Sequence, residues 1–327
     1  MNISSKLLSR PRPQAYENTD GRPTWSPDSS KVAAQLGTDV VVLDRGEAAI
    51  LNKIGPEGRW VDSPDWSPDG SRITFATFDK HEGSDTTSWA VYSSAPDGSD
   101  MKLLSKDAME PEYNPQGDRI AFQHQKSSIQ RIAVMDSDGK NMKLVSSGGF
   151  MQRDFSWSPG GHQVAYDGYF GGGKTIYITD ITGRKERPIT DGAGGLYNDE
   201  NPEWSPDGDN ILFERQNPAV QSNSLWVVNP RTKKEKQVLQ AYGRNLDATW
   251  SPDGKQIAFA SDRDGQGDLD LYVMNIDGTG LKQVTDMPGH EHAPSWSPDG
   301  KAIAFNRLDF DKPKDSRESV HIVELNN

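Results

Sequence analysis

The phrase Trp-Ser-Pro-Asp-Gly returns along this chain and restricts its fold more than any other feature. With the residues that follow it, the phrase reads WSPDGSRITF from residue 66, WSPDGKQIAF from residue 250 and WSPDGKAIAF from residue 296. The aromatic residue that opens the phrase, or its equivalent, recurs every 41 to 47 residues, at Trp25, Trp66, Tyr113, Trp157, Trp204, Trp250 and Trp296. Seven copies fill nearly the whole chain, so we expect one repeat domain over residues 1–327.

Each copy has the pattern of four short strands. In the sixth copy, DATW ends the first strand, SPDG turns, and KQIAFAS, LDLYVMN and LKQVT follow as the second, third and fourth strands. Ser-Pro-Asp-Gly suits a type I turn, with Pro at its second position and Gly at its fourth. Four strands in a repeat of this length are typical of a β-propeller blade, with the aromatic residue filling space in the blade. The sequence therefore predicts an all-β, seven-bladed propeller of antiparallel blades.

The two ends of the chain predict how the ring closes. After Trp296 the residues 294–325 supply only three strands, whereas SKLLS at 5–9 matches the fourth strands MKLLS at 101–105 and MKLVS at 142–146. We expect strand 5–9 to complete the last blade, because this pairing would remove the exposed sheet edges of an open ring. A closed ring needs no second copy to protect its edges, so a monomer is expected, although the sequence does not fix the oligomeric state.

Composition excludes several classes of function. The chain carries 36 basic and 48 acidic residues, a net charge of −12, and no basic stripe of the kind that nucleic acid binding needs. It has no cysteine for disulfides or thiolate metal sites, and no apolar run long enough to span a membrane. MNISSKLLSRPRPQ is not a signal peptide. The protein is thus periplasmic or secreted if a leader was removed, and cytoplasmic otherwise.

The W-S-P-D-G-[KS]-x-I-A-F phrase and its continuation SDRDGQGDLDLYVMN at 261–275 resemble the propeller repeat of TolB-like proteins. That resemblance covers all seven copies and implies the fold. The same repeat occurs in partner-binding periplasmic proteins, peptidase propellers and some polysaccharide lyases. The family pattern of TolB has six blades and an additional N-terminal α/β domain, and this chain departs from both, so the partners of TolB are not carried over. No G-x-S-x-G of a peptidase is present.

The most variable stretches predict a binding site at the mouth of the central channel. The turns between first and second strands are nearly uniform, whereas the second-to-third loops and the connections between blades vary and should form the functional face. The connections carry carboxylates, arginines and aromatic side chains that we expect to line the mouth and to bind a protein, peptide or glycan. These candidates are Arg22, Trp60, Asp62, Glu110, Arg153, Asp154, Tyr197, Asp199, Glu200, Arg244, Asp247, His290 and His292, with Tyr242 near by.

Among these candidates, Trp60 is the strongest, because it lies outside the aromatic position of the repeat and the frame does not require it. The alternative for the whole set is structural, with the polar groups capping strand ends and forming ion pairs.

Two segments could hold a metal. DRDGQGDLD places Asp262, Asp264, Asp268 and Asp270 within nine residues, and such oxygen-rich loops suit calcium, although the pattern favours a solvated hairpin loop over a calcium site. GHEHAPSW places His290 and His292 on one side of an extended segment, where two imidazoles would begin a divalent metal site.

The His-x-His pair also resembles the metal site of oligogalacturonate lyases, which are seven-bladed propellers. Their Gln three residues before the pair is Met287 here, and the further His of that site is absent. The sequence thus favours a non-enzymatic TolB-like scaffold without a catalytic residue or certain cofactor. The alternative is a metal-assisted polysaccharide lyase or hydrolase at the same mouth.

Overall fold

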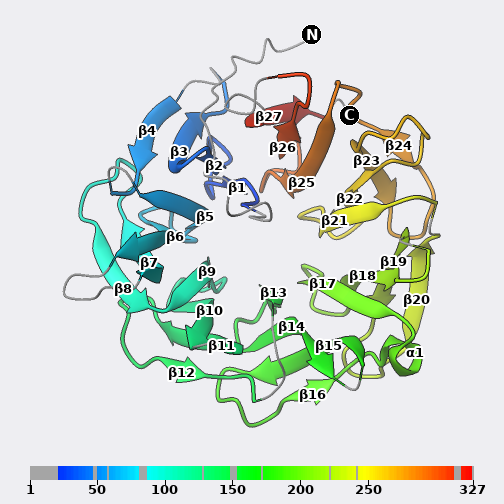
Figure 1. Ribbon diagram of the computed structural model, residues 1–327, viewed down its shortest axis with the longest axis horizontal. Helices are drawn as coiled ribbons and strands as arrows, with labels where there is room; N and C mark the ends of the chain where they lie inside the picture. Colours follow the sequence, from blue (N-terminus) through cyan, green and yellow to red (C-terminus); the bar gives the residue numbers. More distant parts are fainter. Residues whose placement is uncertain are drawn as a thin grey trace.

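Seven antiparallel sheets stand in a ring in the computed structural model, and each sheet forms one blade (Figure 1). The structure describes residues 21–46, 50–56, 59–80, 87–126, 129–147, 153–170, 172–220, 222–240, 242–312 and 318–325. Within these residues, six sheets have four strands and the seventh has three, always in chain order. The predicted seven-bladed β-propeller is confirmed. The described residues include no helix with the length and hydropathy needed to cross a membrane.

Each of the first four blades contains four strands in chain order. Blade 1 contains β1 (Thr24–Trp25), β2 (Lys31–Leu36), β3 (Asp39–Asp44) and β4 (Ile50–Ile54). Blade 2 contains β5 (Trp60–Trp66), β6 (Ile73–Lys80), β7 (Thr87–Ser94) and β8 (Lys102–Lys106). Blade 3 contains β9 (Ala108–Tyr113), β10 (Arg119–Lys126), β11 (Ile129–Asp136) and β12 (Lys143–Leu144). Blade 4 contains β13 (Arg153–Trp157), β14 (Gln163–Phe170), β15 (Gly173–Asp180) and β16 (Arg187–Pro188).

The remaining blades complete the ring. A four-residue helix, α1 (Gly192–Gly195), leads into blade 5, which contains β17 (Asn198–Trp204), β18 (Ile211–Asn217), β19 (Ser222–Val228) and β20 (Glu235–Leu239). Blade 6 contains β21 (Asn245–Trp250), β22 (Gln256–Ser261), β23 (Asp270–Asn275) and β24 (Lys282–Gln283). Blade 7 contains β25 (His290–Trp296), β26 (Ala302–Leu308) and β27 (Glu318–Glu324). The first strand of each blade is the innermost, next to the ring axis (Figure 1).

The apolar core lies between the blades rather than at one centre. Seven buried clusters join side chains of neighbouring blades, and each contains the motif aromatic residue of the blade that follows around the ring, so that Trp25 of blade 1 packs against blade 7. Trp250, for example, packs with Leu212 and Leu225 of blade 5 and with Phe259 of its own blade. The aromatic residue therefore fills the space between two blades, which corrects the expectation that it fills space within one.

The predicted first turn has the same hydrogen bonds from copy to copy. In blade 2 the Gly70 amide donates to the Ser67 carbonyl at 2.8 Å, and Gly70 has a φ of +71° that favours glycine. The Ser67 hydroxyl donates to Asp69 at 2.6 Å. This hydroxyl bond and the two hydrogen bonds from Ser71 hold the pKa of the exposed Asp69 carboxyl below its usual value. The hydrogen bonds within the turn are thus sufficient to fix its conformation, and no ligand is needed for it.

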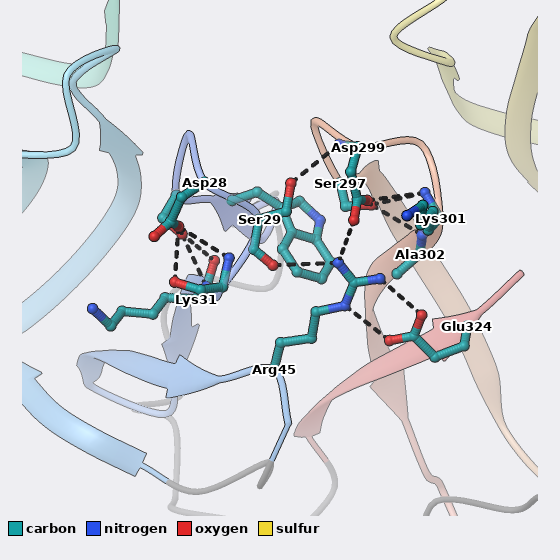
Figure 2. Close-up of polar contacts among 12 residues, drawn as sticks. Asp28, Ser29, Lys31, Arg45, Ser297, Asp299, Lys301, Ala302 and Glu324 are labelled. Atoms are coloured by element: carbon teal, nitrogen blue, oxygen red, sulfur yellow. Dashed lines mark hydrogen bonds and ion pairs between the residues drawn. The ribbon is translucent and has the colours of Figure 1, made fainter.

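The seam between blades 7 and 1 depends on polar contacts. Its apolar cluster takes only two fully buried side chains from blade 7, Ala302 and Ala304. Arg45 compensates, because its guanidinium pairs with Glu324 at 2.8 Å and with Asp299 at 2.9 Å, both on blade 7 (Figure 2). The Asp299 amide also donates to the Ser29 hydroxyl at 3.1 Å. Arg45 of blade 1 therefore forms ion pairs with two acidic residues of blade 7, and we call this arrangement the clamp.

We expect Arg45→Met to destabilise the ring, since it leaves Asp299 and Glu324 without their shared cation. The expected loss is about 1–3 kcal/mol of unfolding free energy, measured by urea denaturation. Arg231→Met is the matched control, because Arg231 forms a single ion pair with Asp209 while 70% of its side chain stays exposed. That control should cost less than about 0.5 kcal/mol. Equal losses in the two variants would contradict the clamp.

The predicted closing strand 5–9 lies outside the described residues, so its pairing with β27 stays a prediction. Its alignment with β8 makes the pairing testable. Leu7 corresponds to Leu103, which is 45% exposed, and Leu8 corresponds to Leu104, which packs on the core between blades 2 and 3. If residues 5–9 complete blade 7, Leu8→Asp should lower the melting temperature by several degrees, whereas Leu7→Asp should leave it nearly unchanged. Equal effects of the two variants would exclude this register.

Candidate functional site

The innermost strands share a backbone irregularity that the repeat did not reveal. In six blades the third residue before the motif aromatic has a φ between 34° and 55°, in the left-handed region that non-glycine residues rarely adopt. The strand pairing shifts register at or beside this residue, which marks a β-bulge. These residues are Ser63, Glu110, Asp154, Asn201, Asp247 and Ala293.

The bulges release backbone amides that bind neighbouring blades. The Ala293 amide of blade 7 donates to Asp247 of blade 6 at 2.9 Å, and the Asp247 amide donates to Glu214 of blade 5 at 2.7 Å. Asn201 and Asn223 also donate to the Glu214 carboxylate. Burial raises the pKa of Glu214 to about 8, and the negative charge of Asp247 adds to this shift. Because the Asp247 carboxylate accepts the Ala293 amide, Asp247 thus contributes to the contact between blades 6 and 7.

Most of the residues predicted to line the mouth lie inside the innermost strands rather than in the connections. The innermost strands begin up to six residues before the motif aromatic, so they include the stretches that looked like connections. Within strands lie Trp60, Asp62, Glu110, Arg153, Asp154, Asp199, Glu200, Asp247, His290 and His292, whereas Arg22, Tyr197 and Arg244 come just before them.

Two predicted carboxylates of blade 5 form ion pairs with their own or the neighbouring blade. Asp199 is fully buried and accepts two hydrogen bonds from Arg215, at 2.6 and 2.9 Å, from the opposite residue of β18. Glu200 pairs at 3.0 Å with Lys174 of blade 4, which pairs equally closely with the buried Asp167. Both carboxylates therefore already have protein cations as partners.

The other predicted polar residues also make contacts within the frame. Asp62 is buried and accepts the Ser63 amide at 2.7 Å, while the amide of Gln123 donates to Glu110. Arg244 pairs with Asp262 at 2.8 Å. These contacts fit the structural alternative that the sequence left open for this set.

The two predicted aromatic positions differ in accessibility. Trp60, the strongest candidate from sequence, is only 7% exposed, because it begins β5 opposite Phe78 and turns inward. Tyr197 is half-buried, whereas Tyr242, in the connection before blade 6, is 67% exposed. Most of the Trp60 ring is thus out of reach of a ligand, whereas the Tyr242 ring is accessible.

The four aspartates of the predicted calcium loop do not converge on a common point. Asp262 pairs with Arg244, Asp264 accepts the Gln266 amide at 3.0 Å, and Asp268 accepts the Gly289 amide at 3.2 Å. Asp270 is buried and accepts the side-chain amide of Gln283. Across the part of the chain that the structure describes, no three His, Asp or Glu side chains form a group that could hold a metal.

The two predicted histidine ligands also have ordinary surroundings. The Leu269 amide donates to Nδ1 of His290 at 2.8 Å, and the ring packs edge-on against Phe310. Burial, and to a lesser extent Arg244, lowers the pKa of His290. Glu291, between the histidines, is fully buried, and burial together with a hydrogen bond to Asp270 raises its pKa to about 8. His292 lies half-buried on the same side of β25 as His290.

Sequence reasoning missed three carboxylates at the ring axis, which we call the axial carboxylates. Asp65, Glu112 and Glu203 each come one residue before the motif aromatic. Burial raises the pKa of Glu112 well above its usual value, and the charges of Asp65 and Glu203 add to this shift. Arg22 of blade 1 reaches Glu203 of blade 5 at 3.4 Å. The available signal was that this position is polar in every copy: Thr24, Asp65, Glu112, Ser156, Glu203, Thr249 and Ser295.

Exposed apolar side chains gather on the face that the sequence predicted to be functional. Six of the large hydrophobic residues that are exposed lie in or beside second-to-third loops and inter-blade connections: Ile129, Tyr169, Leu196, Val220, Tyr242 and Phe310. The other five in the described chain lie in or next to outermost strands: Leu51, Leu103, Met142, Leu144 and Leu281. On the opposite face, Met142 and Leu281 are exposed in third-to-fourth turns, whereas the first turns expose no large hydrophobic residue among the described residues. This distribution marks one face for contact with another molecule.

Comparison with known proteins agrees with the repeat and the ring. The family model described as the TolB beta propeller domain matches residues 8–198 and 201–309. An uncharacterised protein of Agrobacterium fabrum is 30% identical over 166 residues, covering 45% of this chain and 54% of the relative. The Tol-Pal system protein TolB of Gluconobacter oxydans is 31% identical over 115 residues, covering 35% and 24%. The alignments thus span about half or less of these relatives.

A solved structure supports the fold alone. Hydrazine synthase of Kuenenia stuttgartiensis superposes with a TM-score of 0.69 at 15% identity, covering 95% of this chain and 98% of that chain.

The axial carboxylates predict a pH dependence of stability. Burial raises the pKa of Asp65 to about 7, whereas an aspartate in the unfolded chain ionises near pH ~4. The folded protein therefore keeps a proton that the unfolded chain releases, and this contribution to stability is lost as pH rises from about 4 to 7. Asp65→Asn removes the titration, so relative to the parent it should gain about 1–3 kcal/mol between pH ~4 and ~8 in urea unfolding.

The matched control is Ser156→Ala, at the equivalent position of blade 4, where no carboxyl titrates. Its effect on unfolding free energy should be the same at both pH values. A parallel pH dependence of the two variants would show that Asp65 does not ionise as described.

Proposed function

The chain belongs to the TolB β-propeller family, and from this premise we propose that it is a non-enzymatic scaffold that captures a polypeptide. The capture surface is the face built by the second-to-third loops and the inter-blade connections. The observation that carries the proposal is the concentration of exposed apolar loop residues on this face, six against the two in third-to-fourth turns of the opposite face, while the uniform first turns expose none in the described chain. Apolar side chains within a polar rim are the expected anatomy of a protein-binding surface.

The residue types favour a polypeptide over a glycan. Leu196 and Val220 are 71% and 65% exposed and aliphatic, and such side chains pack against apolar groups of a peptide. Aromatic rings such as Tyr242 supply large contact area with little loss of conformational freedom. The net charge of −12 and the axial carboxylates favour a partner that carries basic residues. We therefore propose a partner segment that combines apolar side chains with arginine or lysine.

The alternative of a metal-assisted lyase is not favoured by a specific observation. Its two histidines lie on β25, but Nδ1 of His290 already accepts a backbone amide and Glu291 between them is buried. The calcium alternative has no more support, because Asp262 pairs with Arg244.

Selection from a displayed random peptide library against the immobilised protein tests the proposal. We expect enrichment of peptides with basic and apolar residues, and Tyr242→Ala should weaken their binding about five-fold or more. Lys255→Ala is the control on the first-turn face, where 80% of this side chain is exposed, and it should leave binding unchanged. Binding should also weaken with salt, because part of the attraction is electrostatic. Peptides whose binding depends on Lys255 rather than Tyr242, or selective binding of neutral glycans, would contradict the proposal.

A further inference from the structure

Arg263, in the loop that follows β22, holds its guanidinium over two aromatic rings of blade 6. The central guanidinium carbon lies 5.4 Å from the centres of both Phe259 and Tyr272, which are opposite each other on β22 and β23. Nε donates to the Ser261 hydroxyl at 3.3 Å, and Nη2 donates to the side-chain oxygen of Asn245 at 3.2 Å. Two rings and two hydrogen bonds therefore fix the position of this cation.

An arginine occupies the equivalent place in blade 5, where carboxylates balance its charge. The Arg215 guanidinium carbon lies 5.2 Å from the centre of Phe213 and 4.6 Å from that of Trp226, the matching ring pair of β18 and β19. Arg215 pairs with Asp199 at 2.6 Å and with Glu235 at 2.9 Å. An arginine stacked on this ring pair thus has two acidic partners in blade 5.

Blade 7 also supplies acids to its arginine, whereas blade 6 has an amide at the corresponding position. Arg307 pairs with Asp309 at 3.1 Å and lies 3.7 Å from Glu291. Glu291 and Asp199 both come five residues before the motif aromatic, and both are fully buried. In blade 6 this position holds Asn245, which is equally buried. An amide oxygen accepts a hydrogen bond but carries no charge, so blade 6 keeps the arginine without the acid.

The aspartates on either side of Arg263 do not balance its charge. Asp262 accepts the amide and the guanidinium of Arg244, at 2.7 and 2.8 Å, while Asp264 accepts the Gln266 amide at 3.0 Å. No aspartate or glutamate among the described residues lies within ion-pair distance of the Arg263 guanidinium. Burial lowers the pKa of Arg263, which is the direction expected for a cation removed from water without an anion beside it.

One part of this guanidinium is open to a ligand. Nη1 donates no hydrogen bond within the described chain and is not enclosed by protein, and the residue as a whole is half-buried. Arg263 lies between β22 and β23, on the capture surface that also carries Tyr242. A guanidinium donates to both oxygens of a carboxylate, as Arg215 does to Asp199. Compared with blade 5, the component that blade 6 lacks is a carboxylate.

We propose that the Arg263 guanidinium is a binding site for one carboxylate group, which a bound polypeptide supplies in the role that Asp199 has beside Arg215. Every polypeptide carries a terminal carboxylate, and aspartate and glutamate side chains offer the same group. The net charge of −12 repels anions at long range, so binding here depends on direct contact with the guanidinium. The part that involves a polypeptide rests on the proposed function.

Titration with sodium acetate tests the site without any partner. In protein labelled with ¹⁵N-arginine, the Nε–H signals of Arg263 and Arg215 are assigned by their loss in Arg263→Lys and Arg215→Lys. Acetate, compared with sodium chloride at equal ionic strength, should move the Arg263 signal with half-saturation at about 10–100 mM. The Arg215 signal is the matched control and should stay in place, because Asp199 and Glu235 already pair with that guanidinium. Equal movement of both signals, or no acetate-specific movement of the Arg263 signal, would overturn the proposal.

A second variant supplies the carboxylate from within the chain. Asn245→Asp places an acid where blade 5 has Asp199, so Arg263 should become paired and its acetate-dependent shift should be lost. A shift as large as that of the parent in folded Asn245→Asp would overturn the proposal. Asn245 also donates to the Asn223 carbonyl at 2.6 Å, which aspartate cannot do. If this variant does not fold, the comparison of Arg263 with Arg215 in the parent chain decides the question by itself.

Synthetic copies of the peptides selected on the immobilised protein test the polypeptide as the source of the carboxylate. Each peptide is compared with a copy amidated at its C-terminus and with a copy whose Asp and Glu are replaced by Asn and Gln. One of these changes should weaken binding to the parent about five-fold or more and leave binding to Arg263→Gln nearly unchanged. Loss on amidation identifies the terminal carboxylate, and loss on the other change identifies an acidic side chain. No loss from either change, or an equal loss in Arg263→Gln, would overturn the use of this site by a polypeptide.

The two proposals can fail separately. Acetate binding does not depend on the apolar loop residues, so Tyr242→Ala should leave the shift of the Arg263 signal intact. If peptide selection fails while acetate moves this signal, the carboxylate site remains and the polypeptide scaffold is lost. If peptides bind but acetate has no specific effect, the scaffold remains and the site is lost.

Discussion

The contact on which the ring depends is the packing of each motif aromatic against the blade before it. The Trp250 indole donates to the Glu203 carbonyl, and Trp157 and Trp25 repeat this bond to Glu112 and Ser295. The same aromatic rings fill the apolar space between the blades. One residue per copy thus supplies the packing of each blade contact, and in three copies its indole adds a hydrogen bond, and for this reason the phrase around it changes so little.

The fold could be predicted because its determinants are local and repeated. Spacing of the aromatic residues gave the blade number, and Ser67 to Gly70 form the turn expected from their residue types. The site could not be predicted equally well, because its partners come from other strands and blades. Asp199 was predicted to bind a ligand, but Arg215 lies opposite it on β18 and is its partner. Trp60 was predicted to line the mouth, but it is the first residue of β5. Asp65, Glu112 and Glu203 were overlooked because they adjoin the most regular part of the repeat.

The residue before each motif aromatic combines a structural role of its backbone with a side chain that varies between blades. Its backbone carbonyl can bind the next blade whatever the side chain is, as Ser295 and Glu203 both show. The side chain at this position is therefore free to differ between blades, and serine, threonine, aspartate and glutamate all occur there. This division explains how seven nearly equal blades can present an axis whose charge is uneven.

The seam between blades 1 and 7 has a consequence for the response of the molecule to force. Arg45 joins the first and last described blades, which lie side by side (Figure 1). Tension applied between residues 21 and 325, the first and last that the structure describes, would load this seam before the other six interfaces, which lie along the chain rather than across its ends. Its two ion pairs would extend together, whereas the strands of blade 7 would then unzip one bond at a time. The ring would therefore open at one defined place, with the remaining blades still stacked.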